Sequence, residues 1–225
     1  MSKSNKKIIC IEGLDGVGKT TLLENWKQYF TGTTNPITNY LINPNNIIFE
    51  HFPTDGSEAR RIRKTETNID EEKLQQLMLE DIIQRVDKFF NEDKEEIMIC
   101  DRFLFSNFIY SFGMTISEFT TKVHEVWDDY NLPMFEIFVM NNLKTIVLEI
   151  PENVRLSRIF NGRSESERDS NETETYQNEL YDRYDKLMHS PARQFLEEKF
   201  NITVYYPKDK SFSLNMPKKS GGKKK

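Results

Sequence analysis

The sequence has little cysteine and no long apolar segment. Its two cysteines, Cys10 and Cys100, each lie within a short apolar run, so they cannot build a disulfide framework or a cysteine-based metal site. No stretch of 18 or more apolar residues occurs and the mean hydropathy is −0.67, which excludes a transmembrane protein. The apolar run 8–11 behind the basic N-terminus is too short for a secretory signal. We therefore expect a protein of a reducing, cytoplasmic compartment.

The chain also lacks the basic surplus of a nucleic-acid-binding protein. The last eight residues hold five lysines and no acidic residue, and the rest of the chain carries 26 basic against 36 acidic residues. A nucleic-acid-binding surface needs a basic patch that faces the phosphates, so we expect no specific nucleic-acid binding. The length of 225 residues suits one domain. We assign residues 1–207 to this domain and residues 208–225 to a basic, disordered tail.

Short apolar runs alternate along the chain with segments whose apolar residues recur every three or four positions, such as Leu74, Leu77, Met78 and Ile82. Runs of the first kind are typical of buried parallel strands, and segments of the second kind of amphipathic helices. The alternation predicts an α/β fold of three layers, in which helices flank both faces of a parallel sheet. The predicted strands are 7–11, 47–51, 96–101, 144–150 and 202–206, and the predicted helices are 19–30, 70–90, 116–130, 154–160, 172–188 and 191–200.

The most specific motif is the segment 13–20, which reads Gly-Leu-Asp-Gly-Val-Gly-Lys-Thr and lies between a predicted strand and a predicted helix. It satisfies the pattern G-x-x-x-x-G-K-[ST] of a phosphate-binding loop, or P-loop, in the required context. Backbone N–H groups of such a loop and the helix N-terminus bind phosphate. We predict that Lys19 contacts the β- and γ-phosphates of ATP and that Thr20 binds Mg²⁺. The predicted ATP-binding residues are Gly13, Leu14, Asp15, Gly16, Val17, Gly18, Lys19, Thr20 and Thr21.

Asp101 ends the apolar run 97–101. Ligands of open α/β folds bind at the carboxyl ends of the strands, so we expect Asp101 to lie beside the P-loop and to assist Mg²⁺. A helix cap or a turn is the alternative reading of such an acid. The sequence has no Asn-Lys-x-Asp motif for guanine recognition, and 225 residues leave little room for the extra subdomains of a motor or helicase. These features favour a small kinase.

Arginines occur in four groups near predicted strand ends. Phosphoryl transfer to an acceptor that already carries a phosphate brings two highly charged groups together, which needs more cationic side chains than a neutral acceptor does. A single arginine more often covers an exposed helix face, but four groups favour a phosphorylated acceptor. The groups are Arg60, Arg61 and Arg63; Arg85; Arg102; and Arg155, Arg158, Arg163 and Arg168.

Several segments together resemble one known family. The segment 11–21 is similar to its P-loop, Phe52-Pro53 with the later segment 59–63 to its proline-containing loop, the segment 101–110 to its Asp-Arg-aromatic motif, and the segment 158–184 to its lid and following helix. This family is that of the thymidylate kinases, and the resemblance runs from residue 7 to residue 200. It implies a P-loop kinase fold with a mobile, arginine-bearing lid. It also implies transfer of a phosphoryl group from ATP, with Mg²⁺, to dTMP, which yields dTDP.

The resemblance implies how the charged part of the acceptor is bound. Arg102 would clamp the monophosphate with help from Arg63, and Asp15 would lie near the sugar. The positions of the P-loop that vary in the family include no basic residue here, and in such members the transition-state arginine comes from the lid. The candidates for this role are Arg158, Arg163 and Arg168, which join Lys19, Asp101 and Arg102 as the predicted catalytic residues. A homodimer is implied by the resemblance alone.

The resemblance also implies a pocket for the base and deoxyribose. Phe52 would flank the base, Arg85 would hydrogen-bond the thymine edge, and Ser106 and Tyr110 would shape the pocket. The sequence departs from the family pattern at Asp81, where an aromatic residue that stacks on thymine is expected. The spacing from Arg85 to the Asp-Arg motif is also about one helical turn short. These departures concern the base pocket more than the phosphate site.

Two other functions stay open at the level of sequence. A deoxynucleoside kinase of related fold would use a carboxylate as general base, and Glu50 or Asp55 could serve. The lid arginines, Arg63 and Arg102 argue against it, since a neutral acceptor does not require them. A non-catalytic nucleotide-binding module is the second alternative. It is suggested by the departure at Asp81 and by Asp55 in the loop after Pro53, where relatives often place an arginine or a Gly-Gly-Thr turn.

Overall fold

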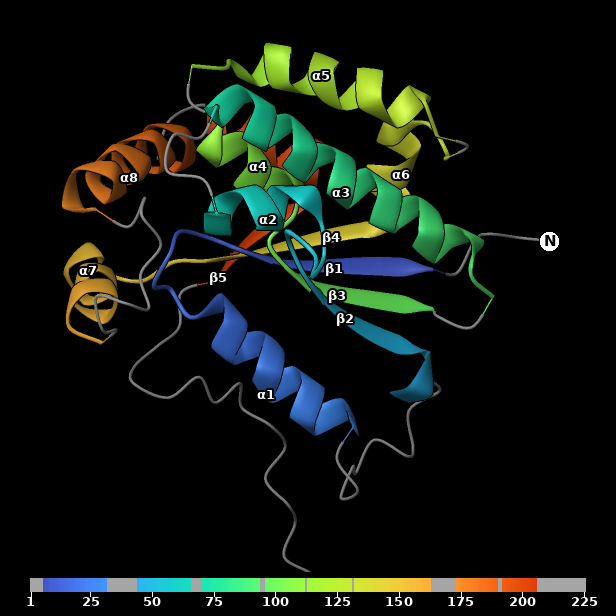
Figure 1. Ribbon diagram of the computed structural model, residues 1–225, viewed down its shortest axis with the longest axis horizontal. Coiled ribbons are helices and arrows are strands. Elements are labelled where there is room, and N and C mark those ends of the chain that lie inside the picture. Colours follow the sequence, from blue (N-terminus) through green and yellow to red (C-terminus); the bar gives the residue numbers. More distant parts are fainter. Residues whose placement is uncertain are drawn as a thin grey trace, which may run out of the picture.

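The computed structural model describes residues 6–31, 44–65, 70–93, 96–111, 113–130, 132–162, 173–189 and 192–205. Within these ranges five parallel strands form one sheet in the order β2-β3-β1-β4-β5 (Figure 1). The predicted α/β fold with a parallel sheet is confirmed. The strands are β1 (Lys7–Glu12), β2 (Ile47–His51), β3 (Ile97–Asp101), β4 (Leu143–Leu148) and β5 (Ile202–Tyr205).

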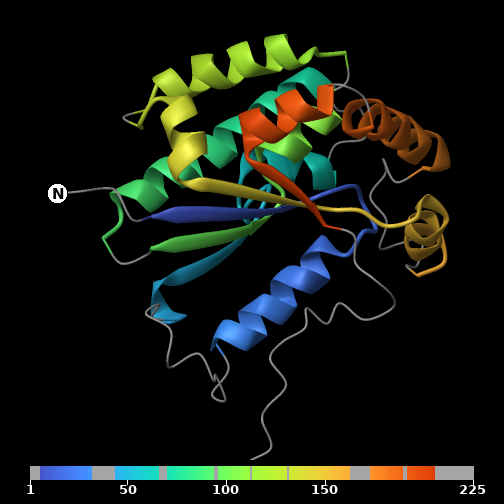
Figure 2. The same cartoon turned by 180° about the vertical axis from the view of Figure 1, so that it is seen from behind.

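Helices cover both faces of the sheet, which confirms the three-layer arrangement. Helix α1 lies against one face, α3, α5, α6 and α9 lie on the other, and α7 and α8 lie at the carboxyl end of the strands (Figures 1 and 2). Within the described ranges none of the helices is both long and apolar enough to cross a membrane. The helices are α1 (Lys19–Thr31), the 3-10 turn η2 (Pro44–Asn46), α2 (Glu58–Thr65), α3 (Glu71–Asn91), α4 (Leu104–Tyr110), α5 (Ile116–Asp128), α6 (Phe135–Asn141), α7 (Glu152–Phe160), α8 (Glu174–Met188) and α9 (Ala192–Phe200).

Three helices and the turn η2 were not predicted from the sequence. Helix α4 follows directly after Arg102, and all of its residues from Leu104 to Ile109 are buried. A seven-residue helix without a polar face gives no amphipathic signal, which needs a window of eleven or more residues. Helices α2 and α6 have eight and seven residues and escape detection for the same reason of length.

Strand register brings the ends of three strands to one edge of the sheet. Asp101 is the register partner of Ile11 in β1 and of His51 in β2, and Glu12 at the end of β1 pairs with Val147 in β4. Because all strands are parallel, this edge is the carboxyl edge, where ligands of open α/β folds bind. The loop that follows β1 therefore leaves the sheet beside Asp101.

Candidate functional site

The P-loop between β1 and α1 requires glycine at two positions that touch other elements. Gly13 has a φ of +129°, and a Cβ atom there would lie 2.5 Å from the carbonyl oxygen of Leu148. Gly16 has a φ of +81°, and a Cβ atom there would lie 2.8 Å from the carbonyl oxygen of Arg155. Both values lie in the left-handed region that favours glycine. The loop therefore packs against β4 on one side and against helix α7 on the other.

Lys19 is buried at the start of α1, and its Nζ donates to the carbonyl oxygens of Gly13 and Leu14, each at 2.9 Å. Burial and the positive charge of Arg102 lower the pKa of Lys19 to about 8, although nearby carboxylates raise it. The ammonium thus lies inside the loop that would surround a phosphate. This is the position that the motif predicts for the lysine.

Thr20 and Asp101 lie side by side. The Thr20 hydroxyl donates to Oδ2 of Asp101 at 2.5 Å, and Nδ1 of His51 lies 3.2 Å from the same oxygen. Oδ1 of Asp101 is buried and has no hydrogen-bond partner among the described residues. Burial opposes ionisation of Asp101, but the bond from His51 and the charges of Lys19 and Arg102 outweigh it and lower the pKa to about 2. Asp101 is therefore an anionic carboxylate with an unused oxygen.

The hydroxyl oxygen of Thr20 and the carboxylate of Asp101 fit Mg²⁺, which binds oxygen ligands. Mg²⁺ usually relies on one or two carboxylates together with the phosphates of a nucleotide. Within the described ranges, no three His, Cys, Asp or Glu side chains converge on a common point that could hold a metal. The residues present thus suit an ion that is bound with its nucleotide, rather than a closed protein cage.

Asp15, Arg102 and Tyr110 form a cluster between the P-loop, the end of β3 and helix α4. The Arg102 guanidinium pairs with Oδ1 of Asp15, and the Tyr110 hydroxyl donates to Oδ2 of Asp15 at 2.8 Å. The guanidinium also lies over the Tyr110 ring, 5.1 Å from its centroid. Burial would raise the pKa of Asp15, but Arg102 and Lys19 outweigh it and hold this pKa well below its usual range. The cluster holds one cation and one anion directly beside the phosphate-binding loop.

Glu12 links β1 to α4. Its carboxylate is fully buried and accepts hydrogen bonds from the backbone N–H of Ser106, at 3.1 Å, and from the Ser106 hydroxyl. Burial raises the pKa of Glu12 to about 7, although these hydrogen bonds and the nearby charges of Lys19 and Arg102 lower it. Ser106, which was predicted to shape the substrate pocket, is thus engaged by Glu12. Sequence reasoning included Glu12 in the P-loop resemblance and assigned it no role.

Two other predicted acceptor residues lie on other elements, Phe52 directly after β2 and Arg63 on α2. Phe52 is 1% exposed and packs edge to face on Phe103, with ring centroids 5.9 Å apart. Burial raises the pKa of Tyr176 on α8, and so do the negative charges of Glu71 and Asp15, whereas Arg63 and Arg102 lower it. The charges of Arg63 and Arg102 therefore both lower the pKa of Tyr176. Sequence reasoning did not name Tyr176 as a site residue.

Arg85 lies elsewhere. Its Nε is 2.5 Å from Oε1 of Glu50, and both residues line a cavity of about 450 Å³ together with His51 and Asp55. The structure thus pairs Arg85 with Glu50 at the edge strand β2 and does not show it in the Asp15 cluster. Ile82, Ile83 and Val86 of α3 are buried in the core, Gln84 is exposed, and Arg85 lies half-buried beside them, where it reaches Glu50.

Asp81, the departure noted in the sequence, is used as an anchor. Its Oδ2 accepts from the backbone N–H of Thr54 at 2.7 Å, and its Oδ1 accepts from the Thr54 hydroxyl at 2.5 Å. Asp81 therefore attaches the loop after Pro53 to helix α3. Both oxygens of the Asp81 carboxylate thus accept hydrogen bonds from Thr54.

Helix α7 carries two arginines that donate to the P-loop. Nη1 of Arg158 donates to the carbonyl oxygens of Gly16 and Val17 at 3.3 and 3.2 Å. Nη1 of Arg155 donates to the carbonyl oxygen of Asp15 at 3.2 Å. Of the predicted lid arginines Arg158 is thus placed at the loop, whereas Arg163 and Arg168 lie outside the described residues.

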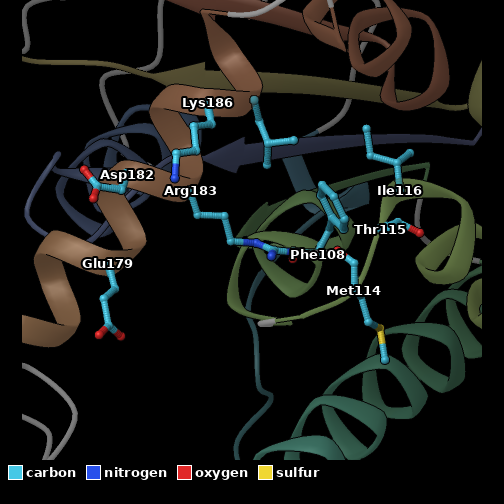
Figure 3. A pocket seen from close by; sticks show the side chains of 9 residues that line it. Phe108, Met114, Thr115, Ile116, Glu179, Asp182, Arg183 and Lys186 are labelled. Carbon is cyan, nitrogen blue, oxygen red and sulfur yellow. Dashed lines mark hydrogen bonds between the residues drawn. The ribbon is translucent and has the colours of Figure 1, made fainter.

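A cavity of about 470 Å³ lies between α8 and the segment that joins α4 to α5. Figure 3 shows Arg183 reaching from α8 towards Phe108. Its guanidinium lies 5.1 Å from the centroid of the Phe108 ring, and its Nη2 donates to the carbonyl oxygens of Phe108 and Met114 at 3.1 Å. Arg183 therefore attaches α8 to the end of α4.

Solved structures of thymidylate kinases share this fold. A thymidylate kinase from Ehrlichia chaffeensis superposes with a TM-score of 0.56 at 14% identity, over 93% of this chain and 91% of that chain. A thymidylate kinase from Candida albicans superposes with a TM-score of 0.54 at 14% identity, over 92% of this chain and 85% of that chain. At such low identity these similarities establish the fold alone.

Sequence similarity is more specific. A curated protein, a probable thymidylate kinase from Methanococcus aeolicus, is 29% identical over 106 residues, which are 46% of this chain and 46% of that protein. The match thus spans about half the length of that relative. The family model described as thymidylate kinase matches residues 11–201, from the end of β1 to the last described strand. Because this match covers most of the sequence, the chain belongs to the thymidylate kinase family.

Proposed function

We propose that this protein catalyses ATP-dependent phosphorylation of dTMP to dTDP. The observation that carries the proposal is the position of the Asp15–Arg102–Tyr110 cluster directly beside the P-loop lysine, within a chain of the thymidylate kinase family. An arginine held next to the donor loop suits an acceptor that already carries a phosphate. A neutral nucleoside acceptor would leave this buried cation without a use.

The reaction would proceed by in-line displacement. An oxygen of the acceptor 5′-phosphate attacks the γ-phosphorus of ATP, the bond from this phosphorus to the bridging oxygen breaks, and the electron pair leaves with ADP. No covalent enzyme intermediate is needed, so the protein acts by positioning the two nucleotides and by neutralising charge. Lys19 would bind the β- and γ-phosphates, and a lid arginine among Arg158, Arg163 and Arg168 would stabilise the transferring group.

Mg²⁺ is part of the proposal. Thr20 and Asp101 would hold the ion, as their adjacent oxygens and the unpartnered Oδ1 of Asp101 suggest. When bound, Mg²⁺ would neutralise phosphate charge and orient the nucleotide. His51 would help to fix the Asp101 carboxylate, since its Nδ1 lies 3.2 Å from Oδ2.

On the acceptor side, Arg102 would clamp the monophosphate, and Arg63 on α2 would assist. Asp15 would lie near the sugar, and Tyr110 would orient Asp15 through the hydrogen bond at 2.8 Å. Phe52 and Ser106 would border the base and deoxyribose. Arg85 remains a predicted base contact, and its Nε pairs with Glu50.

Three further features are proposed on the strength of family resemblance or composition. They are a homodimer, a cytoplasmic location, and the division of the chain into a catalytic domain at 1–207 and a basic tail at 208–225. Size-exclusion chromatography with light scattering, on the full chain and on a chain ending at residue 207, would test the homodimer and the division together.

A coupled assay for ADP release tests the activity. The protein is incubated with ATP and Mg²⁺ and with dTMP, dUMP, other nucleoside monophosphates or thymidine in turn. We expect turnover with dTMP and none with thymidine. Turnover of thymidine alone would replace the proposal by a deoxynucleoside kinase, and ATP binding without turnover of any monophosphate would indicate a non-catalytic module.

A further inference from the structure

Arg155 is a buried cation that has no place in the proposed reaction. It is 1% exposed, and a charge removed from water in this way is tolerated only when it is paired and hydrogen-bonded. Its Nε and Nη2 donate to the two carboxylate oxygens of Glu152, each at 2.6 Å, in a two-pronged ion pair within α7. This pair uses one side of the guanidinium and leaves Nη1 directed away from α7.

The other side of the guanidinium binds helix α8. Nη1 of Arg155 donates to Oε1 of Gln177 at 2.5 Å, and Nη2 donates to the backbone carbonyl of Gln177 at 3.2 Å. Gln177 is fully buried. A guanidinium can only donate, so the amide atom that faces it must be the oxygen. Arg155 thereby fixes the rotation of the Gln177 amide and directs its nitrogen to the opposite side.

That opposite side is occupied by Asp15. Nε2 of Gln177 donates to Oδ2 of Asp15 at 3.3 Å, and Nη1 of Arg155 donates to the backbone carbonyl of Asp15 at 3.2 Å. Arg155 therefore fixes both the main chain and, through Gln177, the side chain of this residue. A continuous series of polar contacts runs from Glu152 through Arg155, Gln177 and Asp15 to Arg102.

We propose that Arg155 is a positioning residue for the acceptor site, which acts through Gln177 to fix the carboxylate of Asp15. The inference rests on the proposed function, because Asp15 and Arg102 would face the acceptor nucleotide. It adds that the acceptor site depends on α7 and α8, the two helices that flank residues 163–172. Helix α8 thus contributes to acceptor binding through a glutamine that sequence reasoning did not single out.

Three variants test separately the contacts that Gln177 and Arg155 make. Gln177→Glu keeps an acceptor for Arg155 but has no proton to give to Asp15. Gln177→Leu removes both bonds, and Arg155→Met removes the guanidinium. The dissociation constants for dTMP and for ATP are measured by isothermal titration calorimetry, with thermal melting and steady-state kinetics in parallel. We expect Gln177→Glu to weaken dTMP binding about tenfold, to change ATP binding less than threefold, and to melt near the wild-type temperature.

Arg155→Met is expected to weaken dTMP binding at least as much, and Arg155→Lys to recover part of the loss because lysine still offers a donor to Gln177. Since Arg155 acts through Gln177, the double variant Arg155→Met/Gln177→Leu should bind dTMP no more weakly than the worse single variant. Additive losses would overturn the inference. So would a dTMP dissociation constant of Gln177→Glu within threefold of wild type, a result that stands even if Arg155→Met does not fold.

Arg183→Met is the matched control. It also removes a guanidinium that attaches α8 to its surroundings, but its contacts are the carbonyls of Phe108 and Met114 rather than Gln177. We expect a lower melting temperature with dTMP binding within threefold of wild type. An equal loss of dTMP affinity in this variant would reduce Arg155 to a general support of α8. Because the decisive readout is binding, wild-type protein that binds dTMP without turnover would refute the proposed function and leave this inference testable.

Discussion

The guanidinium of Arg102 and the carboxylate of Asp15 form an ion pair that joins the end of β3 to the P-loop, with each side chain 13% exposed. Asp15 has two other donors, the Tyr110 hydroxyl and the Gln177 amide. It can therefore keep its orientation when Arg102 turns part of its fork towards an acceptor phosphate. Arg102 itself has a φ of +69°, in the left-handed region that residues other than glycine rarely adopt.

Replacement of Arg102 by lysine should impair acceptor binding selectively. Lysine keeps the positive charge but loses the planar fork that can bind Asp15 and a phosphate together. We expect the KM for dTMP to rise about 100-fold and the KM for ATP to change less than threefold, by steady-state kinetics. Arg193→Lys at the surface pair with Glu197 is the control. An equal rise in both KM values would argue that Arg102 shapes the donor site instead.

Removal of the metal should stop turnover. Chelation by EDTA is expected to abolish ADP release, and added Mg²⁺ to restore it. Asp101→Asn should raise the Mg²⁺ concentration for half-maximal rate at least tenfold, since it replaces an anionic ligand by a neutral amide. Thr20→Ser, which keeps the hydroxyl beside Asp101, should remain near wild type, whereas Thr20→Val of the same shape should not. Equal Mg²⁺ dependence in all these variants would exclude this pair as the metal site.

Glu12 should make stability depend on pH. Because burial raises its pKa from 4.5 to about 7, the folded protein keeps a proton on Glu12 over a range in which the unfolded chain has released it. The free energy of unfolding of the wild type therefore falls as the pH rises from 4.5 to about 7. In Glu12→Gln this contribution is absent. Across this pH range the free energy of unfolding of Glu12→Gln should rise by about 1–3 kcal/mol relative to that of the wild type. At higher pH the difference between the two proteins should stay constant.

Urea unfolding of both proteins at several pH values between 5 and 8 measures this difference. Glu125→Gln, on the exposed face of α5, controls for the loss of a carboxylate. A difference between Glu12→Gln and wild type that stays constant with pH would show that Glu12 is ionised in the folded protein over the whole range.

One lid arginine should dominate the chemical step. Arg158, Arg163 and Arg168 are replaced singly by methionine, and single-turnover rates are measured with both substrates saturating. We expect one variant to lose about 10³-fold in rate, because an arginine at the transferring phosphoryl group contributes on this scale. Both KM values should change little in that variant. If the single-turnover rate fell by less than tenfold in all three variants, none of these arginines would take part in the chemical step.

The sequence was sufficient to predict the sheet and the positions of the P-loop and of Asp101 at its carboxyl edge. Each strand is a short apolar run, and the P-loop pattern fixes the backbone between β1 and α1, so Lys19, Thr20 and Asp101 could be expected at one edge. The fold confirms this edge, because Asp101 is in register with Ile11. Local patterns were informative here because the relevant residues are adjacent in sequence or end neighbouring strands.

The contacts of the acceptor side could not be predicted in the same way. The bond from Gln177 to Asp15 joins residues 162 positions apart, and the bond from Ser106 to Glu12 joins residues 94 apart. Neither Gln177 nor Glu12 belongs to a pattern that implies its partner. Arg155 was counted with three other arginines, and nothing in the spacing of that group distinguishes the buried member from the exposed Arg158. Burial and helix phase decide these cases, and both depend on tertiary packing.

The close approach of Gly16 to helix α7 limits which residues position 16 can accept. A Cβ atom at position 16 would lie 2.8 Å from the carbonyl oxygen of Arg155 and 2.9 Å from Cγ1 of Ile159. An arginine placed in the loop at this position would thus force α7 outward, and α7 is the helix that precedes Arg163 and Arg168. A side chain larger than hydrogen at position 16 would therefore require a compensating change in α7.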